Sequence, residues 1–379
     1  MKITGSIPTH YSAGRLTRGV GRLLVCAGIM LALAIPTGLK AGEAWYPLAV
    51  DVWTPPFNEA MQRQSQQYTP LEKASKPWRI RVFIPHLKDA YWLGVNFGLI
   101  DEARRLGISL SIQEAGGYGQ LAVQRRQIEA ALSETPDGLI IGAISLEGLN
   151  DLVAQAADKG IPVIDLINGL SSKQIAARAA VSFKDMGFES GRYLQKMQSQ
   201  LGRPVKVAWF PGPDNAGWVQ AGDAGFREAI EGSAIEIVDT LYGDTGSGAQ
   251  GKLIEDVLDR YADSLDFIVG TAVTAEAAVK ILRTRGLSDK IKILSYYYGP
   301  GVHRGIRRGH ILAAPSDRPV LQARIATDMV VRILEGKNYL RHVAPKVVVV
   351  DRSNIRTWDS ASTLAPRGFR PIFSINVQK

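Results

Sequence analysis

The chain has 379 residues, 46% of them hydrophobic and 21% charged, which are values typical of a folded globular protein. The formal net charge is +9, but five of these positive charges lie in the first 41 residues, which contain no acid. The remaining chain carries only +4, so a nucleic-acid-binding protein is not indicated. The single cysteine, Cys26, lies in the same first segment, which excludes disulfide bonds and cysteine metal sites from the rest of the chain.

The first 41 residues have the pattern of a secretory signal peptide. Basic residues precede a continuous apolar stretch at 23–36, and the segment ends at the small residue Ala41. The apolar stretch is shorter than the roughly 20 residues that span a bilayer, although an uncleaved membrane anchor is the alternative. A lipoprotein anchor at Cys26 is not expected, because bulky Val25 precedes it. We therefore expect export to the periplasm and cleavage of this segment.

Residues 42–78 form a polar, proline-containing extension. It carries the aromatic residues Trp45, Trp53, Phe57 and Trp78, and rings of this size are costly to leave in water. We expect the extension to pack against the body of the protein; a free tail is the alternative.

From residue 79 onward, short strand-like runs alternate with amphipathic helical runs. Strands are predicted at 79–85, 108–113, 138–143, 161–166 and 179–182. Helices are predicted between them at 90–106, 119–134 and 146–159. This alternation is typical of a parallel sheet that is covered by helices.

The alternation then starts again, which indicates a second unit of similar size. Helices are predicted at 186–201, 218–231, 250–261, 274–285 and 320–334. Strands are predicted at 205–210, 235–241, 267–269, 291–296 and 346–350. The fold class is therefore α/β, with two doubly wound lobes. In an exported protein this arrangement suggests a binding protein whose ligand lies where the carboxyl ends of the strands face each other.

Motifs of catalysis are missing from the sequence. It contains no H-E-x-x-H, G-x-S-x-G or G-x-x-x-x-G-K-[ST] pattern, and no pair of histidines has metal-ligand spacing beside an acid cluster. We therefore predict a protein that is not an enzyme and that has neither a metal nor a cofactor.

Aromatic residues gather where predicted strands end. They are Tyr91, Trp92, Tyr118, Phe183, Trp218 and the tyrosines at 296–298. Such rings present π faces to a cationic methylated nitrogen, at about 0.5–2 kcal/mol for each contact. Stacking on a sugar ring is the competing use, and packing in the core or at a hinge is the alternative for any single ring. Polar candidates for the same site are Asp89, Asp165, Asn215 and Asp317. Because side chains alternate along an extended chain, we expect only one or two of the three tyrosines to reach the ligand.

Six sequence runs carry a resemblance to a known family. They are KDAYWLGVNFG (88–98), EAGGYGQLAVQRRQI (114–128), MGFESGRYL (186–194), PGPDNAGW (211–218), GTAVTAEAA (270–278) and HRGIRRGHILAAPSD (303–317). In this order the chain resembles the TorT family from about residue 79 to 371. The resemblance implies a type I periplasmic binding protein fold, with crossovers near 182–186, 314–319 and 336–343. Lobe one then comprises 79–183 plus 316–338, and lobe two comprises 184–315 plus 339–372.

The same resemblance implies a function. The ligand is expected to be trimethylamine N-oxide, and the partner is expected to be the periplasmic domain of a TorS-like sensor histidine kinase. Tyr91, Trp92 and Tyr118 match the family's aromatic positions in lobe one, and Tyr297 matches a tyrosine in lobe two. Asp89 is expected to orient the site or to face the positive nitrogen.

One position departs from the family pattern. Phe183 stands where family members can carry a tryptophan, which is a stronger π partner, so a related methylated amine or amine oxide is also expected as a ligand. The alternative function is the solute-binding component of an ABC importer for a sugar or a small amine. A transcriptional repressor is disfavoured, because the signal peptide stands where a helix-turn-helix would be.

Overall fold

The computed structural model describes residues 47–58, 63–214 and 216–377. The expected signal peptide lies outside the described residues. Among the helices described, none is long and apolar enough to cross a membrane.

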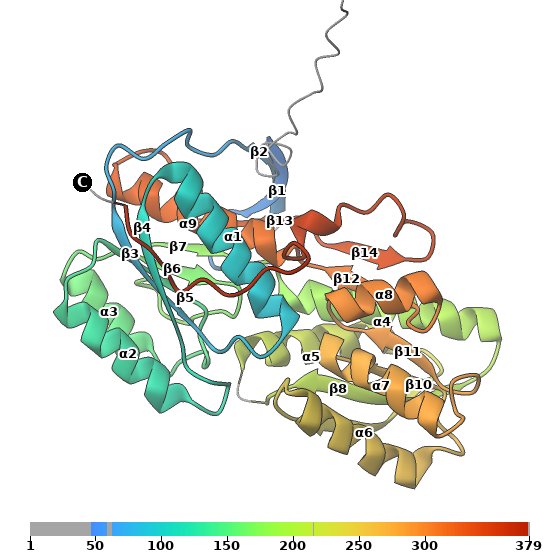
Figure 1. The fold of residues 1–379 in the computed structure, drawn as a ribbon. Helices are drawn as coiled ribbons and strands as arrows, with labels where there is room; N and C mark the ends of the chain where they lie inside the picture. The colour runs from blue at the N-terminus through green and yellow to red at the C-terminus, as the bar shows by residue number, and fades with distance from the viewer. Residues whose placement is uncertain (1–46, 59–62, 215, 378–379) are drawn as a thin grey trace, which may run out of the picture. The chain divides into compact units, whose positions relative to one another are not determined.

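A nine-stranded sheet forms the centre of the first lobe (Figure 1). Its inner strands run parallel, and antiparallel strands close both edges. In sheet order the strands are β15 (Ser374–Ile375), β4 (Ser109–Glu114), β3 (Arg79–Ile84), β5 (Gly138–Ile141), β6 (Val163–Leu166), β7 (Ala177–Ala179), β13 (His342–Pro345), β1 (Leu48–Trp53) and β2 (Arg63–Tyr68). The connections run one way from β3 to β4 and the other way from β4 to β6. Because such connections are right-handed, α1 (Ala90–Leu106) covers one face with α9 (Pro319–Leu334), and α2 (Leu121–Ser133) and α3 (Asn150–Asp158) cover the other.

A four-stranded parallel sheet forms the centre of the second lobe. In sheet order its strands are β11 (Lys292–Ser295), β10 (Phe267–Gly270), β8 (Val205–Gly212) and β9 (Ile235–Tyr242). The first pair of helices, α4 (Phe183–Leu201) and α5 (Gly217–Ile230), pack on one another. The second pair, α6 (Ser247–Tyr261) and α7 (Ala272–Thr284), also pack together. Beside β11 and α7 lie the short α8 (Pro300–Arg308) and an antiparallel pair, β12 (Ala313–Ser316) and β14 (Val348–Asp351).

The predicted fold class, two doubly wound α/β lobes, is confirmed. The chain crosses between the lobes at 180–182, at 316–318 and at 346–347, and a fourth time between β14 and the C-terminal segment. Two segments depart from the expected lobe boundaries. Strand β13 pairs with β7 in the first lobe, so the third crossover comes later than 336–343. The C-terminal segment also returns to the first lobe, where the Ile372 amide donates to Asn96 of α1 and β15 pairs with β4.

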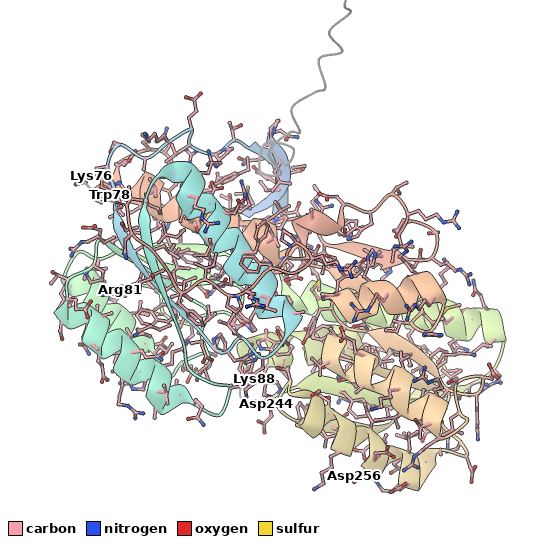
Figure 2. All side chains as sticks on the ribbon, in the orientation of Figure 1. Lys76, Trp78, Arg81, Lys88, Asp244 and Asp256 are labelled. Atoms are coloured by element: carbon pink, nitrogen blue, oxygen red, sulfur yellow. The ribbon has the colours of Figure 1, made fainter. Side chains whose placement is uncertain are left out.

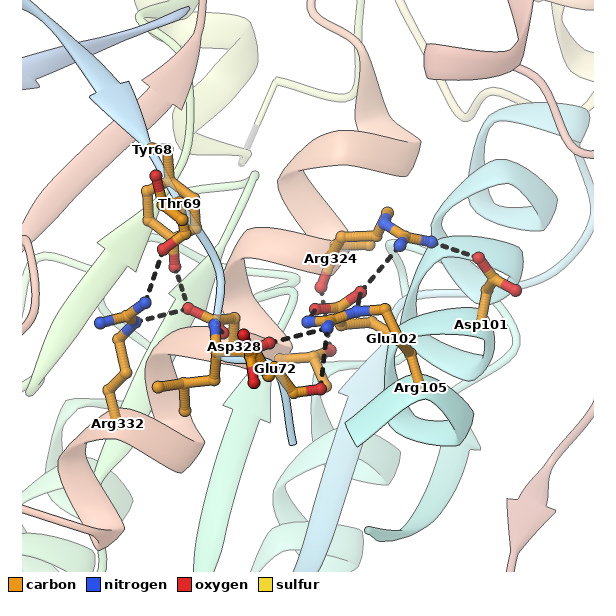
Figure 3. Close-up of polar contacts among 12 residues, drawn as sticks. Tyr68, Thr69, Glu72, Asp101, Glu102, Arg105, Arg324, Asp328 and Arg332 are labelled. Carbon is orange, nitrogen blue, oxygen red and sulfur yellow. Dashed lines mark hydrogen bonds and ion pairs between the residues drawn. The ribbon is translucent and has the colours of Figure 1, made fainter. Parts of the chain in front are cut away.

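The N-terminal extension packs on the first lobe, as expected. Its strands β1 and β2 extend the nine-stranded sheet beyond β13. The carboxylate of Asp328 on α9 then accepts three hydrogen bonds, from the Tyr68 hydroxyl at 2.5 Å, the Leu71 amide at 2.7 Å and Arg332 at 2.7 Å (Figure 3). Arg332 also donates to the carbonyl of Thr69. These contacts bind the extension to the helix that returns from the second lobe.

Candidate functional site

The site lies where the carboxyl ends of both sheets meet. In each lobe one strand sits at the point where successive connections change direction: β3 lies between β4 and β5, and β8 lies between β9 and β10. Ligands of open α/β sheets bind outside the carboxyl ends of the strands at this switch point. The loop after β3 leads to Tyr91 and Trp92, and the loop after β8 leads to Trp218.

A small cavity lies between these strand ends. It is lined by Asp89, Tyr91, Trp92, Tyr118, Ile167, Asn168, Phe183, Trp218, Thr245 and Tyr297. The first lobe contributes the residues up to Asn168, and the second contributes the rest. The space open to the centre of a water-sized sphere is about 20 Å³. A volume of about 10–15 Å³ by this measure holds one water, so the cavity suits a small group.

The rings in this wall touch each other within and across the two lobes. Tyr91 of the first lobe and Tyr297 of the second meet edge to face, with centroids 5.4 Å apart at an interplanar angle of 71°, and within the second lobe Trp218 and Tyr297 lie 6.1 Å apart at 83°. Tyr118 and Trp218 form a further contact between lobes at 6.0 Å. Such spacings are those of favourable aromatic pairs. The ring wall is therefore complete only when the lobes are together.

Asp89 fixes the first part of the wall. It is the N-cap of α1, with extended backbone (φ −119°, ψ 166°), and its carboxylate accepts a hydrogen bond from the Trp92 amide at 3.1 Å. An aspartate in this place satisfies an otherwise unpaired amide of the first turn. The cap thus places Tyr91 and Trp92 in the first turn of the helix, at the mouth of the strand ends.

Two glycines make room for the two tryptophans. A Cβ at Gly142 would come within 2.7 Å of the Trp92 ring, and a Cβ at Gly212 within 2.6 Å of the Trp218 ring. Any other residue at either position would push an indole out of place. Gly212 also has φ 119°, a backbone conformation that favours glycine.

A tight turn after β6 positions Tyr118. Ile167 has φ 70°, which is rare for a β-branched residue, and the Asn168 amide donates to the Leu166 carbonyl at 2.8 Å. The Asn168 side chain then donates to the Tyr118 hydroxyl at 3.1 Å and to the Ala143 carbonyl at 2.7 Å. Strain of this kind is concentrated at functional sites.

Of the three consecutive tyrosines, Tyr297 lines the cavity. The hydroxyl of buried Tyr296 donates to the Trp218 carbonyl at 3.2 Å and so supports the ring wall from behind. Tyr298 pairs with His303 on α8. Tyr296 and Tyr298 therefore do not line the cavity, in keeping with the alternating side-chain directions of an extended chain.

The electrostatics of the cavity favour a positive group. Burial, together with the nearby carboxylates of Glu276 and Asp244, raises the pKa of Asp89 to about 6. Among the described residues that line the cavity there is no lysine, arginine or histidine. The indole N–H of Trp218 is buried and has no acceptor in the described part of the chain. One carboxylate, one unpaired donor and several π faces therefore surround the space.

The other predicted site residues lie elsewhere. Asp317 lies behind the wall, where its carboxylate accepts the Tyr91 hydroxyl at 2.5 Å. Asp165 lies outside the cavity lining, because its carboxylate is paired with Arg178 at 2.6 Å and accepts the Leu170 amide. Asn215 lies outside the described residues. The structure thus brings Asp89, Trp218 and the predicted rings together, but neither Asp165 nor Asp317 joins the lining.

Sequence reasoning missed three lining residues, Ile167, Asn168 and Thr245. The first two follow directly after β6, the strand that contains Asp165. Their signal was the Asn168-Gly169 pair, which marks a turn at a strand end. Thr245 follows β9 in a polar loop that has no aromatic residue to attract attention.

Polar contacts hold the lobes together beside the cavity. His86 accepts the Lys88 amide at Nδ1, which leaves Nε2–H to donate to Thr245 of the second lobe at 3.2 Å. Burial lowers the pKa of His86 to about 4, so the ring is neutral at pH 7. Lys88 and Asp244 form an ion pair at 3.8 Å, which also joins the two lobes (Figure 2).

A second, larger cavity adjoins the first. The two share Asp89, Tyr91, Thr245 and Tyr297 as walls, and the second is also lined by Glu276 and by the first residues of α6, α7 and α8. Its volume by the same measure is about 440 Å³. No group of three or more potential metal ligands occurs among the described residues.

Comparison with known proteins agrees with this architecture. A family model described as "Periplasmic binding protein domain" matches residues 80–338. A solved ABC transporter solute-binding protein from Bradyrhizobium sp. BTAi1, with bound bis-tris, is 51% identical and has a TM-score of 0.76; the match covers 87% of this chain and 98% of that one. The chain is thus a periplasmic binding protein, which is a binding protein and not an enzyme, and its predicted periplasmic location is confirmed.

The comparisons also find relatives that are named TorT. "Periplasmic protein TorT" from Escherichia coli K12 is 37% identical over 317 residues, which cover 84% of this chain and 90% of that protein. The TorT chain in a solved complex with the TorS sensor domain, in the presence of trimethylamine N-oxide, is 30% identical with a TM-score of 0.71; the match covers 78% of this chain and 99% of that one. Within the periplasmic binding proteins, the chain belongs to the TorT family.

Proposed function

We propose that this protein binds trimethylamine N-oxide, or a closely related methylated amine, in the aromatic cavity, and that it reports occupancy to the periplasmic domain of a TorS-like sensor histidine kinase. The observation that carries the proposal is the ring wall itself. Aromatic side chains from both lobes enclose a small space that contains a carboxylate and no basic side chain.

The charge distribution of an amine oxide fits this space. Its methyl groups carry the positive charge of the nitrogen, and each π face attracts such a group by about 0.5–2 kcal/mol. Its oxygen is a strong acceptor, and the unpaired N–H of Trp218 is a buried donor beside the cavity. Asp89 adds a negative charge that favours the nitrogen end.

A sugar fits the same space poorly. Sugar recognition needs room for a ring and several free partners for hydroxyl groups. The cavity is small, the amide nitrogen of Asn168 is already bonded to Tyr118 and Ala143, and Thr245 is bonded to His86. Few side chains are left to bind hydroxyl groups.

The partner is inferred from the relatives. TorT is found in complexes with the TorS sensor domain, both without ligand and with trimethylamine N-oxide. A second function, delivery of a small amine to an ABC importer, is favoured by the 51% identical solute-binding protein with bound bis-tris, which is a hydroxylated tertiary amine. The hydroxyl arms of such a ligand require the adjoining larger cavity.

Calorimetry with the exported protein tests the ligand. Trimethylamine N-oxide, tetramethylammonium, bis-tris and D-ribose are titrated under the same conditions. We expect trimethylamine N-oxide to bind most tightly and ribose to give no heat; tight ribose binding that survives Trp92→Ala would contradict the proposal.

The two partner hypotheses are then separated with the loaded protein. Formation of a complex with a TorS-like sensor domain in size-exclusion chromatography supports the sensor function. Stimulation of the ATPase of an ABC transporter, without any complex with the sensor domain, supports the importer.

A further inference from the structure

Tyr91 faces two ways. Its ring lines the cavity and contacts Tyr297 of the second lobe, while its hydroxyl donates to the carboxylate of Asp317 at 2.5 Å. A phenylalanine would supply the same ring wall without this hydrogen bond. The hydroxyl therefore connects the cavity wall to Asp317, a residue that does not line the cavity.

Asp317 lies in the second crossover between the lobes. It follows β12 and precedes α9, and its neighbour Arg318 has φ 53°, which is unusual for a residue other than glycine. One oxygen of the fully buried Asp317 carboxylate accepts both the Tyr91 hydroxyl and the Gln322 amide, the latter at 2.7 Å. The other oxygen has no partner among the described residues. A buried charge that is held by so few donors is sensitive to the loss of either one.

Gln322 extends the connection to the first crossover. Its amide nitrogen donates to the Asp317 carboxylate and also to the Asp317 carbonyl at 2.8 Å. Its amide oxygen accepts the backbone N–H of Val181 at 3.1 Å. Val181 lies between β7 and α4, where the chain first passes into the second lobe. Three hydrogen bonds, two of them fully buried, therefore run from the cavity wall to the first and second crossovers.

We propose that Asp317 and Gln322 are positioning residues that couple the aromatic cavity to the hinge. Through them, the position of the Tyr91 side chain biases the equilibrium between open and closed lobes. This inference rests on the proposed function, since it assigns the regulation of the same site. Hinge motion changes φ and ψ at a few residues at the ends of helices and strands. The crossovers at Val181 and at Asp317 both lie at such ends. A ligand can shift the equilibrium only through contacts that differ between the two states. The ring of Tyr91 meets Tyr297 only when the lobes are closed, and its hydroxyl fixes the crossover at the same time.

The experiment measures closure directly. Nitroxide labels are attached at Asp158→Cys on α3 and Lys252→Cys on α6, two exposed positions in different lobes. Distances are recorded by pulsed electron spin resonance with and without trimethylamine N-oxide, and ligand binding rates are measured in parallel. The variants are Gln322→Met, which removes the link between the crossovers, and Tyr91→Phe, which removes the first hydrogen bond.

Tyr68→Phe is the matched control. It removes another tyrosine–aspartate hydrogen bond of 2.5 Å, in this case a buried one to Asp328, in the same lobe but away from the cavity. Any general effect of losing such a bond on stability is therefore present in the control as well.

We expect both variants to shift the unliganded protein towards longer, more open distances, and to speed ligand dissociation roughly tenfold with a smaller change in association. Tyr68→Phe is expected to keep the wild-type distances. Wild-type distance distributions in both variants would overturn the inference. If wild-type protein gives no heat with trimethylamine N-oxide in calorimetry, the proposed ligand is wrong. The label distances in the unliganded variants still test whether Asp317 and Gln322 couple the cavity to the hinge.

Discussion

At the scale of single residues, Asp89 combines two roles that substitutions can separate. Its side chain caps α1, and its charge faces the cavity. Asn is as good an N-cap as Asp but carries no charge. Asp89→Asn is therefore expected to bind tetramethylammonium at least tenfold more weakly, while its melting temperature stays the same or rises, because burial already disfavours the carboxylate at pH 7.

Asp89→Ala is the comparison for this variant. It removes the cap as well as the charge, so it should lose about 1 kcal/mol of stability in addition to the binding defect. Equal binding by Asp89→Asn and wild type would show that the carboxylate does not face the ligand.

The pH dependence of binding follows from the same residue. Burial raises the pKa of Asp89 to about 6, so its proton is bound more tightly in the folded protein than in the unfolded chain. The contribution of Asp89 to the stability of the unliganded protein therefore increases as pH falls from 7 towards 4. Affinity for tetramethylammonium, which has a fixed charge, should be constant above about pH 7 and fall below about pH 6, as measured by calorimetry. An Asp89→Asn variant with the same pH profile would contradict this assignment.

Phe183 offers a test of specificity. It lines the cavity and lies 5.7 Å from the ring of Trp218. A larger indole at this position strengthens the π contact and reduces the free space. Phe183→Trp should improve binding of trimethylamine N-oxide by about 0.5–1 kcal/mol and weaken binding of bulkier bis-tris, in the same calorimetric assay. A gain for both ligands would show that Phe183 does not limit the space.

At the scale of elements, the N-terminal extension is held by a small set of buried polar contacts. The carboxylate of Asp328 accepts hydrogen bonds from Tyr68, Leu71 and Arg332 (Figure 3). Removing one member of a buried charged network leaves the others uncompensated. Asp328→Ala should therefore cost roughly 3 kcal/mol of unfolding free energy and raise amide hydrogen exchange across 63–71.

Asp151→Ala provides the control for that prediction. It breaks a bidentate ion pair with Arg125 on the surface of the same lobe, and exposed pairs contribute at most about 1 kcal/mol. If Asp328→Ala costs no more than Asp151→Ala, the polar network does not hold the extension.

Secondary structure was predictable wherever pattern and local chemistry agree. Helix 90–106 was predicted to the residue, because Asp89 caps its start and Gly107, with φ 76°, ends it. The strand predicted at 179–182 is found at Ala177–Ala179, because 180–182 is a crossover whose amide at Val181 bonds to Gln322. Such a bond across 141 residues leaves no trace in local sequence. Helix α8 was missed because it is short, and strands β12 and β13 were missed because they are short and pair with strands distant in the sequence.

At the scale of the whole molecule, the doubly wound topology explains why a ligand site exists where it does. Each lobe places its switch-point strand, β3 or β8, so that the following loop meets the other lobe. The rings at strand ends were predictable because aromatic residues are unusual there. The roles of Asp165 and Asp317 were not predictable. An aspartate near the end of a strand can face a ligand, an arginine or a tyrosine, and only the tertiary partners decide between these.

The central claim is that a methylated nitrogen lies among the rings between the lobes. A crystal structure of the exported protein grown with trimethylamine N-oxide tests it most directly. We predict the ligand in the small cavity, with its nitrogen within about 6 Å of the ring centroids of Tyr91, Trp92 and Tyr297 and its oxygen towards a hydrogen-bond donor such as the Trp218 indole. A small cavity without trimethylamine N-oxide, or with the ligand bound only in the adjoining larger cavity, would contradict the account.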